Sequence, residues 1–71
     1  MQKINNSTTR IWTNADLKET VKQCKAAGFV ITRPSDMVQI NDPSTGAVVL
    51  RSLPYQSNVN MVHIDQSYFE S

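Results

Sequence analysis

Apolar residues recur at helical spacing between residues 12 and 29. Leu17, Val21 and Cys24 are separated by four and three positions, so one side of a helix would carry all three. The positions beside them are mostly polar or charged, which is typical of a helix with one side in water. This spacing predicts an amphipathic helix that packs its apolar side on the rest of the domain.

Both ends of this helix carry recognisable end signals. Thr13 is a preferred N-cap residue, and Asp16 stands three positions later, where an acidic side chain favours the free amides and positive end of a helix. Trp12 and Leu17 occupy the positions of a hydrophobic staple. Gly28 stands where a left-handed residue commonly ends a helix. The helix is therefore expected to begin after Thr13 and to end before Gly28.

After residue 28 the apolar pattern changes to a period of two, which is typical of strands. Four strands are expected, over residues 29–33, 37–41, 47–52 and 59–65. Turn residues mark 34–36 and 42–46, and Pro54 with its polar neighbours predicts a longer loop over 53–58. The β-prone stretch 8–12 is compatible with a short further strand before the helix.

Strand parity divides these positions between the two faces of a sheet. The inward positions are expected to be Val38, Ile40, Val48, Leu50, Val62 and Ile64. The outward positions are expected to be Met37, Gln39, Val49, Arg51, Met61 and His63. The first strand adds either Phe29 and Ile31 or Val30 and Thr32 to the core, and the pattern leaves both choices open.

Together these elements predict an α+β domain, in which one amphipathic helix packs on an antiparallel sheet of three to four strands. The expected order is α-β-β-β-β, with the possible short N-terminal strand in front. A chain of 71 residues suits a single small domain, which would span residues 1–71. The terminal stretches 1–7 and 66–71 are expected to fray.

Charge separates the two halves of the chain, although the net charge is only +1. Residues 1–33 contain six basic and two acidic side chains, whereas residues 34–71 contain one basic and four acidic ones. The single cysteine excludes an internal disulfide, and the sequence shows no basic leader and no long apolar run. These observations favour a cytoplasmic protein without membrane association.

The sequence gives little support for a catalytic or a metal-binding site. The only cysteine, Cys24, and the only histidine, His63, could in principle form a nucleophile and a base. Helix and strand parity direct Cys24 to the core and His63 to the outer face, so the two should not meet. The aspartates lack metal-ligand spacing, and both glycines are explained by a helix end or a turn. We therefore expect a non-enzymatic protein with no catalytic residue, no metal site and no cofactor.

Two binding functions remain, and the first is a small protein-binding module. Its contact surface would be the outer sheet face with the adjoining loop, through Arg51, Tyr55, Met61 and His63. The partner would be a foreign protein or a second copy of the chain in a homodimer. Small size alone suggests an accessory or inhibitor protein of the kind that phages and mobile elements encode.

The alternative is a small nucleic-acid-binding domain that uses the basic side of the helix. Three lysines share this side at helical spacing: Lys18, Lys22 and Lys25. Asp16 and Glu19 reduce the local positive charge, and the sheet lacks the stacked aromatic residues of a single-strand binder. The nucleic-acid function is therefore the second choice.

Overall fold

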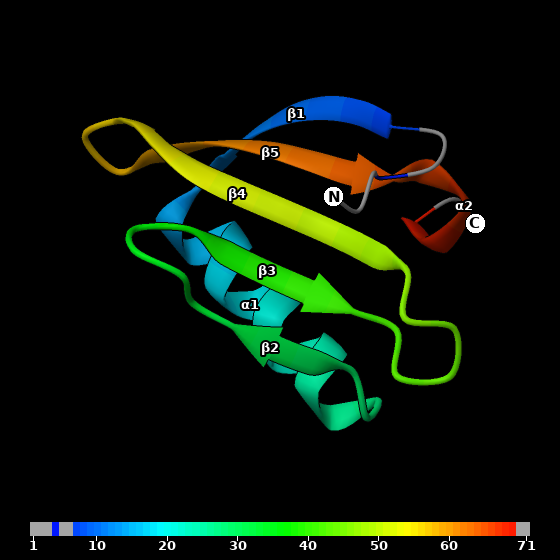
Figure 1. Cartoon of the computed structure of the whole chain (residues 1–71). Coiled ribbons are helices and arrows are strands. Elements are labelled where there is room, and N and C mark those ends of the chain that lie inside the picture. The colour runs from blue at the N-terminus through cyan, green and yellow to red at the C-terminus, as the bar shows by residue number, and fades with distance from the viewer. Residues whose placement is uncertain (1–3, 5–6, 70–71) are drawn as a thin grey trace.

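The computed structural model describes residue 4 and residues 7–69. The elements follow in the order β1 (Ser7–Thr13), α1 (Asn14–Ala26), β2 (Val30–Thr32), β3 (Val38–Asn41), β4 (Val48–Gln56), β5 (Val59–Asp65) and α2 (Gln66–Phe69). The strands form one antiparallel sheet in the order β1-β5-β4-β3-β2, and α1 lies against one of its faces (Figure 1). The α+β prediction is confirmed. The sheet has five strands because the N-terminal stretch pairs with β5.

The ends of α1 follow the sequence signals. The side chain of Thr13 accepts a hydrogen bond from the amide of Asp16 at 3.2 Å, as an N-cap does. At the other end, Gly28 has a φ of 94°, and its amide donates to the carbonyl of Lys25. The amide of Phe29 donates to the carbonyl of Cys24, which completes a Schellman motif. The helix therefore begins after Thr13 and ends before Gly28, as predicted.

The start of α1 is hydrogen-bonded to the hairpin between β4 and β5. The amide of Asn14 donates to the carbonyl of Asn58 at 3.1 Å. The side chain of Asn60, which is buried on the inner face, donates to the side-chain oxygen of Asn14 at 2.7 Å. These two bonds satisfy polar groups at the helix start and fix where α1 leaves the sheet.

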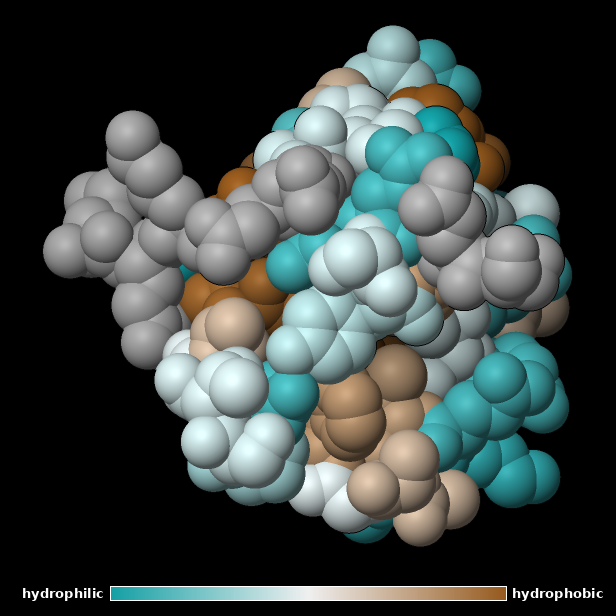
Figure 2. Space-filling view, turned by 90° about the vertical axis from the view of Figure 1, so that its right-hand side faces the viewer, coloured by the Kyte–Doolittle hydropathy of each residue, from teal (hydrophilic) through white to brown (hydrophobic). Residues whose placement is uncertain are grey.

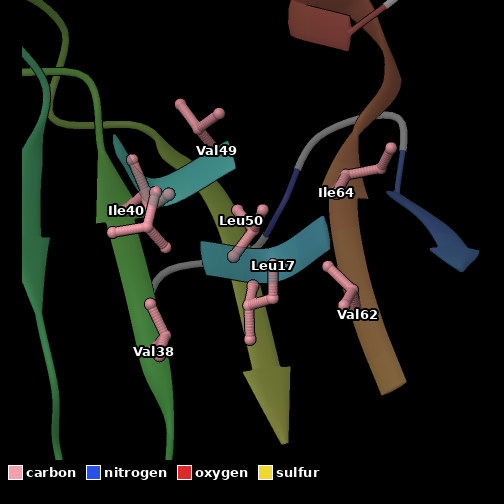
Figure 3. Close-up of a cluster of buried hydrophobic side chains, with 8 residues drawn as sticks. Leu17, Val38, Ile40, Val49, Leu50, Val62 and Ile64 are labelled. Atoms are coloured by element: carbon pink, nitrogen blue, oxygen red, sulfur yellow. The ribbon is translucent and has the colours of Figure 1, made fainter. Parts of the chain in front are cut away.

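The core lies between α1 and the inner face of the sheet. Its buried side chains are Leu17, Val21, Val38, Ile40, Val49, Leu50, Val62 and Ile64. Figure 3 shows residues of β3, β4 and β5 gathered around Leu17 of α1. Trp12, Cys24, Phe29 and Ile31 pack against this cluster from its margin. Of the two sets left open for the first strand, Phe29 and Ile31 therefore belong to the core.

A β-bulge overturns the expected orientation of Val49. The register pairs Ile40 with Leu50 and Asn41 with Val48, so Val49 is an extra residue on β4. Val49 consequently packs in the core with 1% of its surface exposed, although parity places it outside. Val48 is also buried, but it lies outside the core cluster and opposite Asn41. The outward prediction for Val49 is wrong for this reason, whereas Val48 is buried as predicted.

The expected loop over residues 53–58 is also wrong, because β4 continues to Gln56. Pro54 lies opposite Asn60 within the strand, beside a second irregularity that leaves Tyr55 without a register partner. A bulge is one of the places where a strand accepts proline. Only Ser57 and Asn58 form the turn, and Asn58 has a φ of 62°. Asparagine tolerates this left-handed conformation better than most residues.

The short helix α2 closes one end of the molecule, within the stretch that was expected to fray. The carboxylate of Asp65 accepts hydrogen bonds from the amide and the hydroxyl of Ser67. Phe69 meets Trp12 edge to face with ring centroids 6.2 Å apart, and Tyr68 meets Phe29 in the same way at 6.0 Å. The expected fraying of residues 1–3, 5–6 and 70–71 lies outside the described residues.

One contact joins α2 to the turn between β3 and β4. The hydroxyl of Tyr68 donates to a carboxylate oxygen of Asp42 at 2.7 Å, and the hydroxyl and amide of Ser44 donate to the other oxygen. The hydrogen bond from the Ser44 hydroxyl, followed by that from Tyr68, holds the pKa of Asp42 below its ordinary value. The bond to Asp42 raises the pKa of the Tyr68 hydroxyl.

This pairing predicts a loss of stability in acid. The pKa of Asp42 is lower in the folded than in the unfolded protein, so its contribution is complete above the unfolded value of about 4. The contribution should disappear as the pH falls through the lowered folded pKa. Urea unfolding of Asp42→Asn from pH 6 to pH 2 should therefore give a shallower acid dependence than the unchanged protein. The matched control is Asp36→Asn, on an exposed turn. Equal slopes for Asp42→Asn and the unchanged protein would contradict the assignment.

Candidate interaction surface

The outer face of the sheet carries a row of apolar side chains across three strands. Ile11 of β1 pairs with Met61 of β5, and Met61 pairs with Leu53 of β4. Ile11 is 54% exposed, Leu53 is 41% exposed, and Met61 is half-buried. We call these three residues the apolar row. Residues directly opposite one another on one face of a sheet have contacting side chains, so the apolar row is continuous.

A polar row runs beside the apolar row and crosses all five strands. In strand order from β1 to β2, its members are Thr9, His63, Arg51, Gln39 and Thr32. The hydroxyl of Thr9 lies 3.2 Å from Nδ1 of His63, and Nε of Arg51 donates to the side-chain oxygen of Gln39 at 3.2 Å. Gln39 in turn donates to the side chain of Asn41 at 2.9 Å. We call these five residues the polar row.

The two rows together resemble the composition of protein interfaces. Binding surfaces combine an apolar centre with polar groups that fix register and orientation. Here the polar side chains already hold one another in place, so less side-chain entropy would be lost when a partner orders them. The face opposite α1 therefore offers a flat, partly apolar and preorganised surface.

The structure brings three of the four predicted contact residues together. Arg51 and His63 are opposite one another in the polar row, and Met61 lies one row away on the same strand as His63. Tyr55 is 53% exposed but stands at the bulge near the hairpin tip, apart from the other three. The sequence analysis missed Ile11 and Leu53. The β-prone stretch 8–12 had indicated a strand, but its sequence does not alternate and so did not show which side Ile11 would take.

The basic side of α1 faces away from the core. Lys18, Lys22 and Lys25 are exposed, and they form no ion pair with any residue in the part of the chain that the structure describes. Arg33 lies near Lys18, because both line a shallow cavity of about 260 Å³ at the beginning of the helix. Arg33 therefore adds a fourth cation beside this basic side.

Cys24 and His63 lie on opposite sides of the sheet. Cys24 packs against the core from α1, whereas His63 belongs to the polar row on the outer face. Burial raises the pKa of the Cys24 thiol, which makes the thiolate scarcer at neutral pH. The two side chains therefore cannot act on one substrate as nucleophile and base.

Cys24 also lines a cavity of about 250 Å³ at the end of the molecule closed by α2. Figure 2 looks onto this end and shows an apolar area between hydrophilic residues. The cavity lies between α1, Val49 of β4 and the aromatic rings of Tyr68 and Phe69. Among the described residues that line it, the nucleophilic groups are the Cys24 thiol and the hydroxyls of Thr20 and Tyr68.

In residue 4 and residues 7–69, no three or more histidine, cysteine, aspartate or glutamate side chains come together in a way that could hold a metal ion. No helix in the same part of the chain has the length and apolar character needed to cross a membrane.

Comparison of the chain with protein-family models, with curated proteins and with solved structures finds no significant match.

Proposed function

We propose that the protein is a small protein-binding module whose contact surface is the outer face of the sheet. The observation that carries this proposal is the apolar row of Ile11, Met61 and Leu53, exposed beside the polar row. A sheet with a helix on one side only leaves such a row in water unless a partner covers it. A domain of this size gains stability when a second apolar surface is buried.

A double substitution in the apolar row tests the contact. Leu53→Asp with Met61→Asp should preserve the fold, because both side chains lie on the outer face, but should abolish partner binding. A carboxylate at the centre of an interface is desolvated without a counterion, which disfavours association strongly. The measurement is capture of proteins from extracts of the source cells, with and without nuclease, followed by mass spectrometry.

The matched control is Ala15→Asp with Ala26→Asp, which introduces the same two charges at exposed positions of α1, away from the outer face. The captured proteins should persist with this control and disappear with the Leu53 and Met61 double variant. Sedimentation of the purified chain reveals whether the partner is a second copy, and in that case the thermal midpoint should rise with protein concentration. Identical partners and identical oligomeric state in all three proteins would contradict the proposal.

A second candidate function is phosphate-backbone binding by the basic side of α1. It is supported by the position of Arg33 beside Lys18, which adds a fourth cation to the three lysines. Replacing Lys18, Lys22 and Lys25 together by Gln should abolish nucleic-acid binding without unfolding the domain, since the three side chains are exposed.

The salt dependence gives this second candidate a quantitative test. Three neutralised phosphates predict a slope of about −2 to −3 when the logarithm of the binding constant is plotted against that of the salt concentration. Fluorescence anisotropy with duplex and single-stranded probes measures this slope. Absence of binding to every probe at low salt would exclude the candidate.

A further inference from the structure

The two edges of the sheet differ in how they are protected. The β2 edge is only three residues long, and Arg33 and Pro34 follow it directly. Short edge strands and adjacent proline discourage pairing with another chain. The β1 edge is seven residues long, contains no proline and is rich in threonine and other β-prone residues. Only the β1 edge therefore offers a long template for an added strand (Figure 1).

The backbone of β1 has one strand partner, β5. In an antiparallel pair, successive residues direct their amide and carbonyl groups alternately toward and away from the partner. Roughly half of these groups along Ser7–Thr13 therefore point away from β5. The side chains of Thr9, Arg10 and Ile11 in the middle of the strand are exposed, so a peptide could approach this edge from solvent.

A cavity lies at the inner side of the same edge. Its volume is about 300 Å³, and it is bordered by β1, α1, α2 and β5. Trp12 and Phe69, which meet edge to face, form its aromatic wall. Among the residues that the structure describes, Arg10 is the only charged one in its lining, which also contains the side chains of Gln23 and Gln66. Every second side chain of an added strand would point to the inner face of the sheet, where this cavity lies.

We propose that β1 binds an extended peptide segment of a partner protein as a sixth strand, with an acidic side chain of that segment in the cavity beside Arg10. Backbone hydrogen bonds would supply affinity. The cavity would supply selectivity for a peptide side chain on the inner face of the sheet, where every second side chain of the added strand points. A carboxylate fits because it accepts from the guanidinium of Arg10, while its aliphatic stem can lie against the aromatic wall.

Arg10 also explains why the occupant is a foreign segment rather than a second copy. If two copies of β1 paired in antiparallel orientation over their full length, Arg10 of one copy would lie directly opposite Arg10 of the other. Like charges at opposed positions destabilise a strand pair, and an inward-pointing charge is a common device against edge-to-edge association. The same charge attracts an acidic strand. This edge is separate from the outer face of the proposed function, and its occupancy does not depend on Met61 or Leu53.

A designed peptide tests the edge directly. The probe is acetylated and amidated Val-Thr-Val-Glu-Val-Thr-Val, which has the same side-chain order in either direction and so permits parallel and antiparallel addition. Titration into ¹⁵N-labelled protein should shift the amide signals of β1 and those of Gln23 and Phe69, and should slow amide exchange in β1. A peptide with the same side chains but N-methylated at every backbone amide, so that neither edge can donate, should bind at least about tenfold more weakly.

A charge swap tests the role of Arg10. Replacing the peptide's Glu by Lys should weaken binding about tenfold, and the Arg10→Glu protein should restore the affinity of the Lys peptide to within about threefold of the original pair. Arg33→Glu is the matched control and should restore nothing, because Arg33 lies outside this cavity. No shift in β1 at about 5 mM peptide, equal binding of the N-methylated peptide, or no recovery in the swap would overturn the proposal.

These outcomes are independent of the outer face. If the Leu53 and Met61 double variant loses its captured partners while the peptide leaves β1 unperturbed, the proposed function stands and the edge site is rejected. If the double variant keeps its partners and the peptide binds β1 with the expected charge dependence, the edge site stands and the outer-face contact is rejected.

Discussion

A single Val49→Asp substitution should unfold the domain. Val49 has 1% of its surface exposed and packs among Ile40, Leu50 and the other core side chains. A carboxylate there would have no counterion in the core, and its desolvation would cost roughly 3–5 kcal/mol or more. A domain of this length has a free energy of unfolding of about 4–10 kcal/mol. Circular dichroism and urea unfolding should show a protein that is largely unfolded or only marginally stable at neutral pH.

Leu53→Asp and Val30→Asp are the matched controls for this experiment. Both replace an aliphatic strand residue with aspartate, but Leu53 is 41% and Val30 is 46% exposed. Their unfolding free energies should change by about 1 kcal/mol or less, because a surface carboxylate stays hydrated. A Val49→Asp protein as stable as these controls would show that Val49 faces outward and that the bulge in β4 is absent.

Phe69→Ala should produce the second largest change. Phe69 is half-buried, packs against the core and meets Trp12 edge to face. Removing the ring should lower the unfolding free energy by about 1–3 kcal/mol, less than for a fully buried phenylalanine. Since Trp12 is the only tryptophan, its fluorescence reports directly on this contact. The emission of the folded variant should move to longer wavelength as water reaches the indole ring.

Tyr68→Phe separates this packing effect from the other attachment of α2. It removes the hydrogen bond to Asp42 but retains a ring that can pack against Phe29. The Trp12 emission should therefore remain as in the unchanged protein. If Phe69→Ala left both emission and stability unchanged, α2 would not be docked on Trp12 as described.

Local rules were sufficient for the helix and for most of the sheet. The N-cap at Thr13 and the left-handed Gly28 act within a few residues, so their signals are present in the sequence itself. The parity of β3 and β5 was also correct, because both strands alternate without interruption at Val38, Ile40, Val62 and Ile64. In these segments local preference and tertiary packing agree.

The failures occurred where a strand departs from its period. The bulge adds one residue, Val49, to β4, so alternation fails at this position, whereas Leu50 and Arg51 keep their predicted sides. Pro54 similarly suggested a loop, because proline cannot donate a backbone hydrogen bond to a neighbouring strand. A strand accepts it beside a bulge, and the position of the bulge cannot be read from the sequence. The apolar row was incomplete for the same reason, since Leu53 lies in the segment that was read as a loop.

The pairing of β1 with β5 has a consequence for how the chain acquires its structure. Ser7 lies opposite Asp65, so the first strand finds its only strand partner in the last one. During synthesis on a ribosome, β1 would remain without its partner until β5 had been made. Closing so long a segment of chain slows folding relative to domains of the same size with local pairing. The order β1-β5-β4-β3-β2 thus predicts a domain that folds as a unit only once β5 is available, with the unpaired β1 as its most vulnerable segment until then.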